Sequence, residues 1–126
     1  MHLNKDLNKF QRADFQKLIE QLEKDDENYH LETVDFRNCA LEKLNLSGLN
    51  LTNFDFSGSS FKHVNFSTCK LSKSVLETVH FVSCKIMDAE LKDCNFRRVL
   101  ADDCDFSDSY ISGDQTDMKL INTCVF

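Results

Sequence analysis

The sequence predicts a mainly β fold in which a five-residue repeat winds the chain into stacked square coils, preceded by a short α-helix. Two observations carry this prediction. From Phe36 onward almost every fifth residue is apolar, whereas the apolar residues before the repeat follow helical spacing. The chain has 126 residues, 41% of them hydrophobic, which suits a single globular domain.

The repeat is clearest in a column of large apolar residues at a spacing of five. Thr116 is its one polar member, and most of the Phe residues in the chain lie in it. The column consists of Phe36, Leu41, Leu46, Leu51, Phe56, Phe61, Phe66, Leu71, Leu76, Phe81, Ile86, Leu91, Phe96, Ala101, Phe106, Ile111, Thr116, Ile121 and Phe126.

A second column, two residues earlier, is small or apolar almost throughout and contains all 6 Cys. It consists of Val34, Cys39, Leu44, Leu49, Phe54, Ser59, Val64, Cys69, Ser74, Val79, Cys84, Ala89, Cys94, Val99, Cys104 and Ser109, and continues at Cys124. Between the columns stand short polar residues suited to bonding nearby backbone at a turn, namely Asp35, Asn45, Asn50, Asp55, Asn65, Asn95 and Asp105.

A period of five fits neither an α-helix nor an extended strand. Two inward residues separated by one outward residue describe a short strand followed by a corner, and four such sides close a coil of about 20 residues. Stacking at this period predicts four inward ladders. They are Phe36, Phe56, Leu76 and Phe96 on the first side; Leu41, Phe61, Phe81 and Ala101 on the second; Leu46, Phe66, Ile86, Phe106 and Phe126 on the third; and Leu51, Leu71, Leu91 and Ile111 on the fourth.

The stretch from Leu44 to Gly58, which reads LNLSGLNLTNFDFSG, resembles the pentapeptide-repeat family, and the likeness covers roughly residues 31 to 126. The resemblance implies a right-handed quadrilateral parallel β-helix with Leu or Phe at the central inward position. It implies little about function, because members of this family range from DNA mimics that protect gyrase to secreted effectors.

The cysteines allow three interpretations. None of them forms a CxxC pair, and no His shares their column, which argues against a metal site. Stacking places Cys84, Cys104 and Cys124 above one another at a spacing within the range for a disulfide, although parallel side chains in register do not favour the required torsion. We expect buried, reduced thiols that act as small apolar fillers, with a disulfide as the alternative.

Residues 1–28 are expected to form a helical cap and residues 29–126 the β-helix. Phe15, Leu18, Ile19 and Leu22 follow helical spacing, with Asp14 placed as the N-cap. Leu3, Leu7 and Phe10 suggest an earlier helical turn. Covering the open strand edges of the first coil is the expected role of the cap, and binding a partner is the alternative.

The repeat breaks between about Ser112 and Lys119, where we expect a bulge, or a one-residue slip that turns Met118 and Leu120 inward. It resumes at Ile121, Cys124 and Phe126, after which the chain stops. An apolar coil without a cap favours end-to-end stacking on a second copy, so Ile121, Cys124 and Phe126 are candidates for a two-fold dimer interface.

Composition excludes several functional classes. The net charge of −6 argues against direct binding to nucleic acid or anionic lipid. No apolar run is long enough to span a bilayer and the N-terminus lacks a signal sequence, so we expect a cytoplasmic protein. Scattered His residues, no placed nucleophile and no Gly-rich phosphate loop predict a non-enzyme without cofactor or metal.

Two binding functions remain, and the first is mimicry of DNA, as the resemblance to quinolone-resistance proteins implies. Acidic residues concentrate between Asp88 and Asp117, with Asp88, Asp93, Asp102, Asp103, Asp105 and Asp108 as a candidate patch for a basic partner such as a topoisomerase. From residue 29 onward the 14 acidic and 10 basic residues leave a net charge of −4. DNA as long as the expected rod would carry roughly 14 negative charges, so the mimic is weak overall. Solvated turns that keep the rod soluble are the alternative reading of this patch.

The second function is a protein-interaction scaffold for a partner with a basic or mixed surface. Apolar residues occupy outward positions on the second side, where His80, Val82, Leu100 and Leu120 are the interface candidates. Scattered surface hydrophobic residues are the alternative. We favour the scaffold, with topoisomerase-directed DNA mimicry second, because the net charge of the repeat region is well below that of DNA of the same length.

Overall fold

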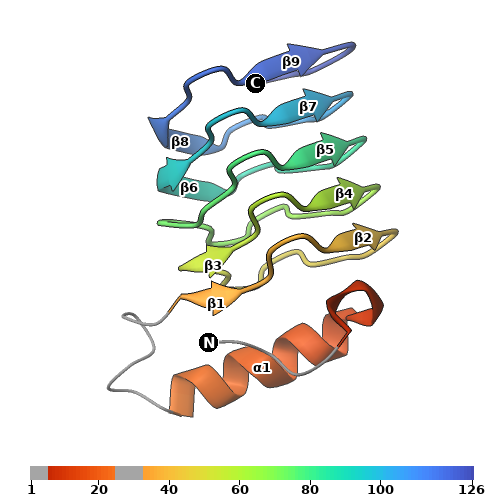
Figure 1. Ribbon diagram of the computed structural model, residues 1–126, viewed down its shortest axis with the longest axis vertical. Helices are drawn as coiled ribbons and strands as arrows, with labels where there is room; N and C mark the ends of the chain where they lie inside the picture. The colour runs from red at the N-terminus through yellow and green to blue at the C-terminus, as the bar shows by residue number, and fades with distance from the viewer. Residues whose placement is uncertain (1–5, 25–32) are drawn as a thin grey trace.

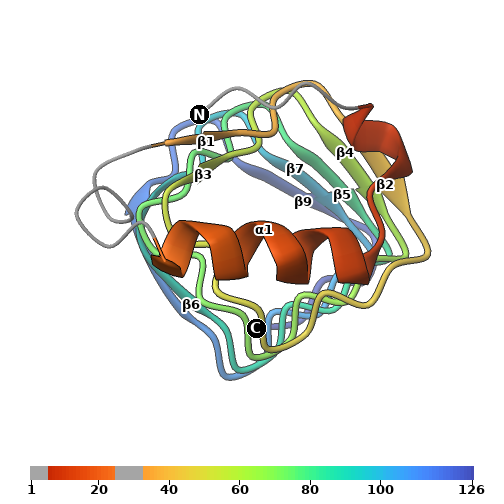
Figure 2. The same ribbon diagram turned by 90° about the horizontal axis from the view of Figure 1, so that it is seen from below.

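The protein is a stack of square coils closed at one end by a helix, as the computed structural model shows for residues 6–24 and 33–126 (Figure 1). Seen along the stack, the coils have a four-sided outline with α1 lying across it (Figure 2). The predicted fold class, a mainly β right-handed quadrilateral solenoid with a short helix, is confirmed. The predicted boundary between residues 28 and 29 lies outside the described residues.

The regular elements are short, as expected for sides of about five residues. A 3-10 helix, η1 (Leu7–Lys9), and α1 (Arg12–Lys24) precede the strands. The strands are β1 (Val34–Asp35), β2 (Ala40–Glu42), β3 (Phe54–Asp55), β4 (Ser60–Lys62), β5 (His80–Val82), β6 (Glu90–Asn95), β7 (Leu100–Asp102), β8 (Tyr110–Asp114) and β9 (Lys119–Ile121).

All strand pairing is parallel, between successive coils. The second side forms a sheet of five strands in the order β2-β4-β5-β7-β9, and its register joins Leu41 to Phe61 and Phe61 to Phe81. The strand pair β1-β3 lies on the first side. The pair β6-β8 begins on the fourth side and continues into the first. The offset of 20 residues confirms the predicted length of a coil.

The two inward columns are buried as the sequence predicts. Every member of the large apolar column from Phe36 to Phe106 and of the second column from Val34 to Cys104 is buried. Phenylalanine rings touch continuously along the stack: Phe61 and Phe81 lie 5.5 Å apart between ring centroids, and Phe106 and Phe126 lie 5.0 Å apart. Burial of these ladders is the main stabilising term of the fold.

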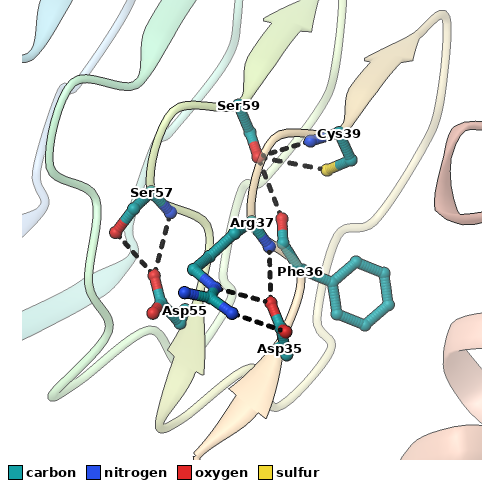
Figure 3. A network of polar contacts seen from close by, with 7 residues as sticks. All are labelled: Asp35, Phe36, Arg37, Cys39, Asp55, Ser57 and Ser59. Atoms are coloured by element: carbon teal, nitrogen blue, oxygen red, sulfur yellow. Dashed lines mark hydrogen bonds and ion pairs between the residues drawn. The ribbon is translucent and has the colours of Figure 1, made fainter. Parts of the chain in front are cut away.

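The predicted turn residues are confirmed in all seven cases. The side-chain oxygen of each short polar residue accepts a hydrogen bond from the backbone N–H two residues later. Figure 3 shows two successive coils, with Asp35 bonded to the Arg37 amide at 3.1 Å and Asp55 bonded to the Ser57 amide at 3.0 Å. These bonds satisfy backbone donors that the corner takes out of the sheet.

The helix α1 covers the first coil, as predicted. Phe15, Leu18, Ile19 and Leu22 are buried in the same cluster as the coil interior, and the Phe15 ring stacks on Phe36 at 5.0 Å. The predicted earlier turn is present as η1, while Leu3 lies outside the described residues.

The start of α1 differs from the prediction. Asp14 is not the N-cap, because the helix already begins at Arg12. Its Oδ2 instead accepts a hydrogen bond from the Gln11 amide at 2.8 Å, the reciprocal half of a capping box. An acidic side chain can accept from the free N–H groups of a helix start either at the N-cap or at the third helical residue. The sequence alone therefore left the start of α1 uncertain by two to three residues.

Side chains of the cap also satisfy the open backbone edge of the first coil. Arg12 donates from one guanidinium nitrogen to the carbonyls of Asn45 and Ser47, at 3.1 and 2.9 Å. Asn8 Oδ1 accepts from the Ala40 amide at 2.7 Å. These contacts replace the coil that would otherwise lie below.

The last coil contains the one-residue slip that the sequence analysis considered. The register runs Leu91 to Ile111 but then Cys94 to Gly113, and on the second side Ala101 pairs with Leu120. The parallel ladder therefore turns Leu120 inward and Ile121 outward, opposite to the uninterrupted repeat. The slip leaves the coil one residue short as far as Ile121, and the usual offset returns at Val125, so Phe126 stacks on Phe106 as predicted.

Candidate interaction surfaces

The six cysteines have free thiols, and all except the half-buried Cys124 are buried. They do more than fill space. Five of them donate to the backbone carbonyl 23 residues earlier, in the coil below, as Cys69 does to Leu46 at 2.9 Å and Cys94 to Leu71 at 3.0 Å. Ser59, Ser74 and Ser109 donate their hydroxyls in the same way, as Figure 3 shows for Ser59 and Phe36.

Sequence reasoning missed this ladder of thiol and hydroxyl donors. Its signal was present, because Ser and Cys share one otherwise apolar column and both carry a short side chain with a hydrogen to donate. Burial raises the pKa of the Cys69 and Cys94 thiols to about 11, and the neighbouring Cys104 thiol together with burial raises the pKa of Cys84. These thiols are therefore structural donors rather than nucleophiles.

The histidines and the possible metal ligands of the described residues lie apart. No cluster of three or more His, Cys, Asp or Glu residues able to hold a metal is found in residues 6–24 and 33–126. His63 occupies a corner with a left-handed φ of 54°, whereas His80 lies on the outer face of β5. Across the same two ranges, no helix is long and apolar enough to cross a membrane.

The predicted acidic patch gathers mainly around the third side. Asp103 and Asp108 occupy its two corners, Asp88 lies one coil below Asp108, and Asp105 lies on the side itself. Asp102 ends β7 beside Asp103, but Asp93 lies at the far end of the fourth side. The six residues therefore form a group of five and one outlier, because a corner separates residues that are close in sequence.

Three of these carboxylates already have partners within the protein. Asp105 accepts from the Ser107 amide at 2.9 Å and from the Ser107 hydroxyl, which hold the pKa of Asp105 below its usual value. Asp102 accepts from the Asn122 side chain at 2.6 Å, and Asp103 from the Ser83 hydroxyl at 3.1 Å. Their contribution to binding stays a prediction.

The apolar face of the second side is present with one exchange of residues. His80 and Leu100 follow one another in one outward column, and Val82 lies beside them in the next column, between Lys62 and Asp102. Leu120 does not join them, because the slip places it inward above Ala101, and Lys119 takes the position above Leu100. Ile121, predicted inward, lies outward above Asp102 and is 41% exposed. We call His80, Val82, Leu100 and Ile121 the second-side strip.

A groove borders the second-side strip at the corner toward the first side. Arg98, Val99, Leu100, Asp117 and Lys119 line it. Asp102 lies within the strip, between Val82 and Ile121, and Asp103 follows it at the corner toward the third side. The strip thus lies between a mixed, partly basic edge and an acidic edge, and this arrangement would orient a bound partner.

The coil from Tyr110 to Phe126 exposes apolar side chains. Among the described residues, every exposed large hydrophobic side chain belongs to it: Tyr110, Leu120, Ile121, Val125 and Phe126. Cys124, the third dimer candidate, is half-buried and donates to the Ala101 carbonyl at 3.4 Å. Exposed apolar side chains grouped at a sheet edge are typical of an interaction surface.

Inward ladders at a period of five, left-handed corners and an offset of 20 residues define a quadrilateral parallel β-solenoid. Residues 29–106 match the family described as the pentapeptide repeat region, and the chain belongs to this family. No curated protein matches the chain in sequence.

Solved structures of similar proteins include a pentapeptide repeat protein, Rfr23, from the cyanobacterium Cyanothece 51142. It is 15% identical with a TM-score of 0.40, and the match covers 75% of this chain and 65% of the other. QnrB1, a plasmid-mediated fluoroquinolone resistance protein, is 20% identical in a trypsin-treated form with a TM-score of 0.31, covering 69% of this chain and 48% of that one. The chain thus spans less than two thirds of either structure.

Proposed function

We propose that this protein is a non-catalytic scaffold that binds a partner protein through the second-side strip. The observation that carries the proposal is the change in the outward columns of one continuous sheet. The lower coils present Ala40, Glu42, Ser60 and Lys62, whereas the upper coils present His80, Val82, Leu100 and Ile121 together with Asp102 and Lys119. Apolar residues grouped on a rigid face are typical of an interaction site.

The rigidity of the face supports this role. Each strand of the second side except the two outermost is hydrogen bonded on both edges, and its inward residues are buried. A partner therefore meets side chains that need little ordering on binding, which lowers the entropic cost of association. The charged borders of the strip favour a partner with a mixed surface.

The test compares the double variant Val82→Ser with Leu100→Ser against the matched control Lys70→Ser with Lys85→Ser, two exposed positions away from the second side. All four residues lie outward, so neither pair should change the unfolding transition. Quantitative affinity capture from the source cells should lose its specific partner only with the Val82 and Leu100 pair. Equal capture by both variants would contradict the proposed face.

A second candidate function is mimicry of DNA toward a type II topoisomerase such as gyrase. The observation that favours it is the group of Asp88, Asp102, Asp103, Asp105 and Asp108 around the third side. Gyrase supercoiling with and without a fluoroquinolone tests it. Mimicry predicts inhibition or drug protection that Asp88→Asn with Asp108→Asn weakens, whereas a scaffold without this target leaves supercoiling unchanged.

We also propose that two copies stack end to end through the coil from Tyr110 to Phe126, and that the protein works in the cytoplasm. Stacking would cover the exposed apolar side chains and double the length of the acidic side. A reducing compartment suits the chain because oxidation would remove thiol donors from the interior ladder.

A further inference from the structure

Within residues 6–24 and 33–126, one edge of the second-side sheet carries backbone groups for which no partner is found. The upper edge of β2 (Ala40–Glu42) is paired, since the Cys39 carbonyl accepts from Ser60 at 2.9 Å and the Lys43 amide donates to Lys62 at 2.9 Å. Alternation then turns the backbone groups of Ala40 and Glu42 to the lower edge. Asn8 takes the Ala40 amide, which leaves the Ala40 carbonyl and both backbone groups of Glu42.

The cap does not fill the space beside these groups. A cavity of about 470 Å³ opens between η1 and the second side, and Asn8, Phe10, Leu41, Glu42 and Lys62 are among its lining residues. Arg12 bonds the lower edge of the third side, and α1 crosses the coil diagonally, so neither reaches β2 (Figure 2). The open edge and the cavity therefore coincide at Glu42.

We propose that β2 binds an extended peptide segment of a partner protein, which adds as a parallel strand in this cavity. Three consecutive residues of such a segment would complete the edge, with two N–H groups donating to the Ala40 and Glu42 carbonyls and one C=O accepting from the Glu42 amide. The coil above supplies contacts of this kind to the upper edge of β2. An extended backbone matches this row of groups.

The lining residues specify the segment further. The first of these three residues points inward between Leu41 and Phe10, both nearly fully buried, so it must be small. The following residue lies below the exposed Glu42, where a basic side chain is complementary. The recognised sequence is thus extended, with a small residue followed by Lys or Arg.

The experiment uses the full chain and the blocked peptide acetyl-Thr-Thr-Ala-Lys-Thr-amide. Titration to millimolar concentration, followed by NMR, should shift the Glu42 amide saturably and slow its hydrogen exchange at least tenfold. Glu42→Pro removes the N–H on an edge that tolerates proline and should abolish the saturable shift of neighbouring amides, whereas Glu42→Ala keeps the N–H and binding within a few-fold.

A second pair of peptides makes the result independent of how the proline variant folds. Methylating the Ala nitrogen removes the donor to the Ala40 carbonyl and should abolish binding to the unmodified protein, and replacing Ala by Phe should do the same by size. Equal binding of the methylated peptide, or no saturable shift at Glu42, would overturn the proposal. This peptide site rests on the proposed scaffold role but uses a separate edge of the sheet. The variant with Val82→Ser and Leu100→Ser should therefore leave peptide binding unchanged.

Discussion

The corners of the solenoid hold residues in a conformation that side chains normally avoid. Fifteen non-glycine residues among those described have φ between 50° and 64°, nearly all at a spacing of five. Each costs about 1 kcal/mol relative to ordinary backbone. The neighbouring coil compensates, since corner amides such as those of Asn38 and His63 donate to carbonyls of the coil above.

Gly113 differs from these corners, and its substitution should be severe. Its φ is 121°, and a Cβ would lie 1.9 Å from the Cys94 carbonyl oxygen and 2.8 Å from the Cys94 nitrogen. Both atoms are backbone at the register slip and cannot yield. We expect Gly113→Ala to lower the free energy of unfolding by about 3 kcal/mol or more, measured by urea denaturation.

The matched control is Gly48→Asn. Gly48 has a φ of 76°, and the nearest atom to a Cβ there is Thr68 Oγ1 at 3.8 Å. Asn38 and Asn53 already occupy equivalent corners, so this change should cost less than about 1 kcal/mol. Equal losses for the two variants would show that the close approach at Gly113 does not exist.

The buried thiols should make the free energy of unfolding fall as the pH rises into the alkaline range. The folded state raises the pKa of Cys69 and Cys94 to about 11, so the unfolded chain loses these protons first as pH rises. Their contribution is complete below about pH 8.5 and disappears as pH approaches 11. At pH 10 it amounts to a loss on the order of 2 kcal/mol per thiol relative to neutral pH.

Serine substitution isolates this effect from other titrating groups. Cys69→Ser with Cys94→Ser keeps a donor to the coil below, as Ser59 and Ser74 do natively, but removes the titration. Urea unfolding between pH 7.5 and 10 should fall less steeply for the variant than for the unmodified chain. Parallel pH profiles would mean that the two thiols ionise equally easily in both states.

At the scale of elements, α1 is the end cap of the stack. Phe15 is fully buried, and its ring contacts Phe10 at 5.2 Å and Phe36 at 5.0 Å between centroids. The aromatic column therefore passes from the helix into the coils without interruption. Unfolding of the cap would expose both this column and the edge that Arg12 satisfies.

We expect Phe15→Ala to lower the free energy of unfolding by about 3 to 5 kcal/mol, because it leaves a cavity between helix and first coil. Gln16→Ala, an exposed position on the same helix, should stay within about 0.5 kcal/mol of the unmodified chain. Denaturation followed by circular dichroism measures both. A Phe15 variant as stable as the Gln16 variant would favour the alternative that α1 is reserved for a partner.

How far the sequence predicts the elements depends on whether the periodicity is unbroken. From Phe36 to Phe106 each inward residue, turn residue and strand offset follows from counting by five, because every coil repeats the same contacts. The inward turn of Leu120 in place of Ile121 was one of two predicted alternatives, since the choice between a bulge and a slip depends on Gly113 meeting the backbone of Cys94. The open edge at Glu42 was hidden, because backbone hydrogen bonding leaves no trace in residue type.

At the scale of the whole molecule, the two ends of the stack differ in how far their apolar side chains and backbone edges are covered. The first coil is covered by aromatic contacts and by side chains that bond its backbone edge. The opposite coil presents Leu120, Ile121, Val125 and Phe126, each more than 40% exposed, and β9 pairs only with β7 among the described strands. The Phe106–Phe126 stack leaves Phe126 60% exposed at this end.

A second copy stacked through this coil would bury these side chains. We expect the chain of 126 residues to have twice its mass of 14.6 kDa by light scattering at high micromolar concentration. Leu120→Asp with Phe126→Asp should return it to a single mass, because each copy would bring two buried, unpaired carboxylates into the contact. Thr52→Asp, a charge added on the outer surface of a lower coil, should leave the dimer intact. A single-chain mass for the unmodified protein at 200 µM would remove end-to-end stacking, and with it the doubling of the acidic side.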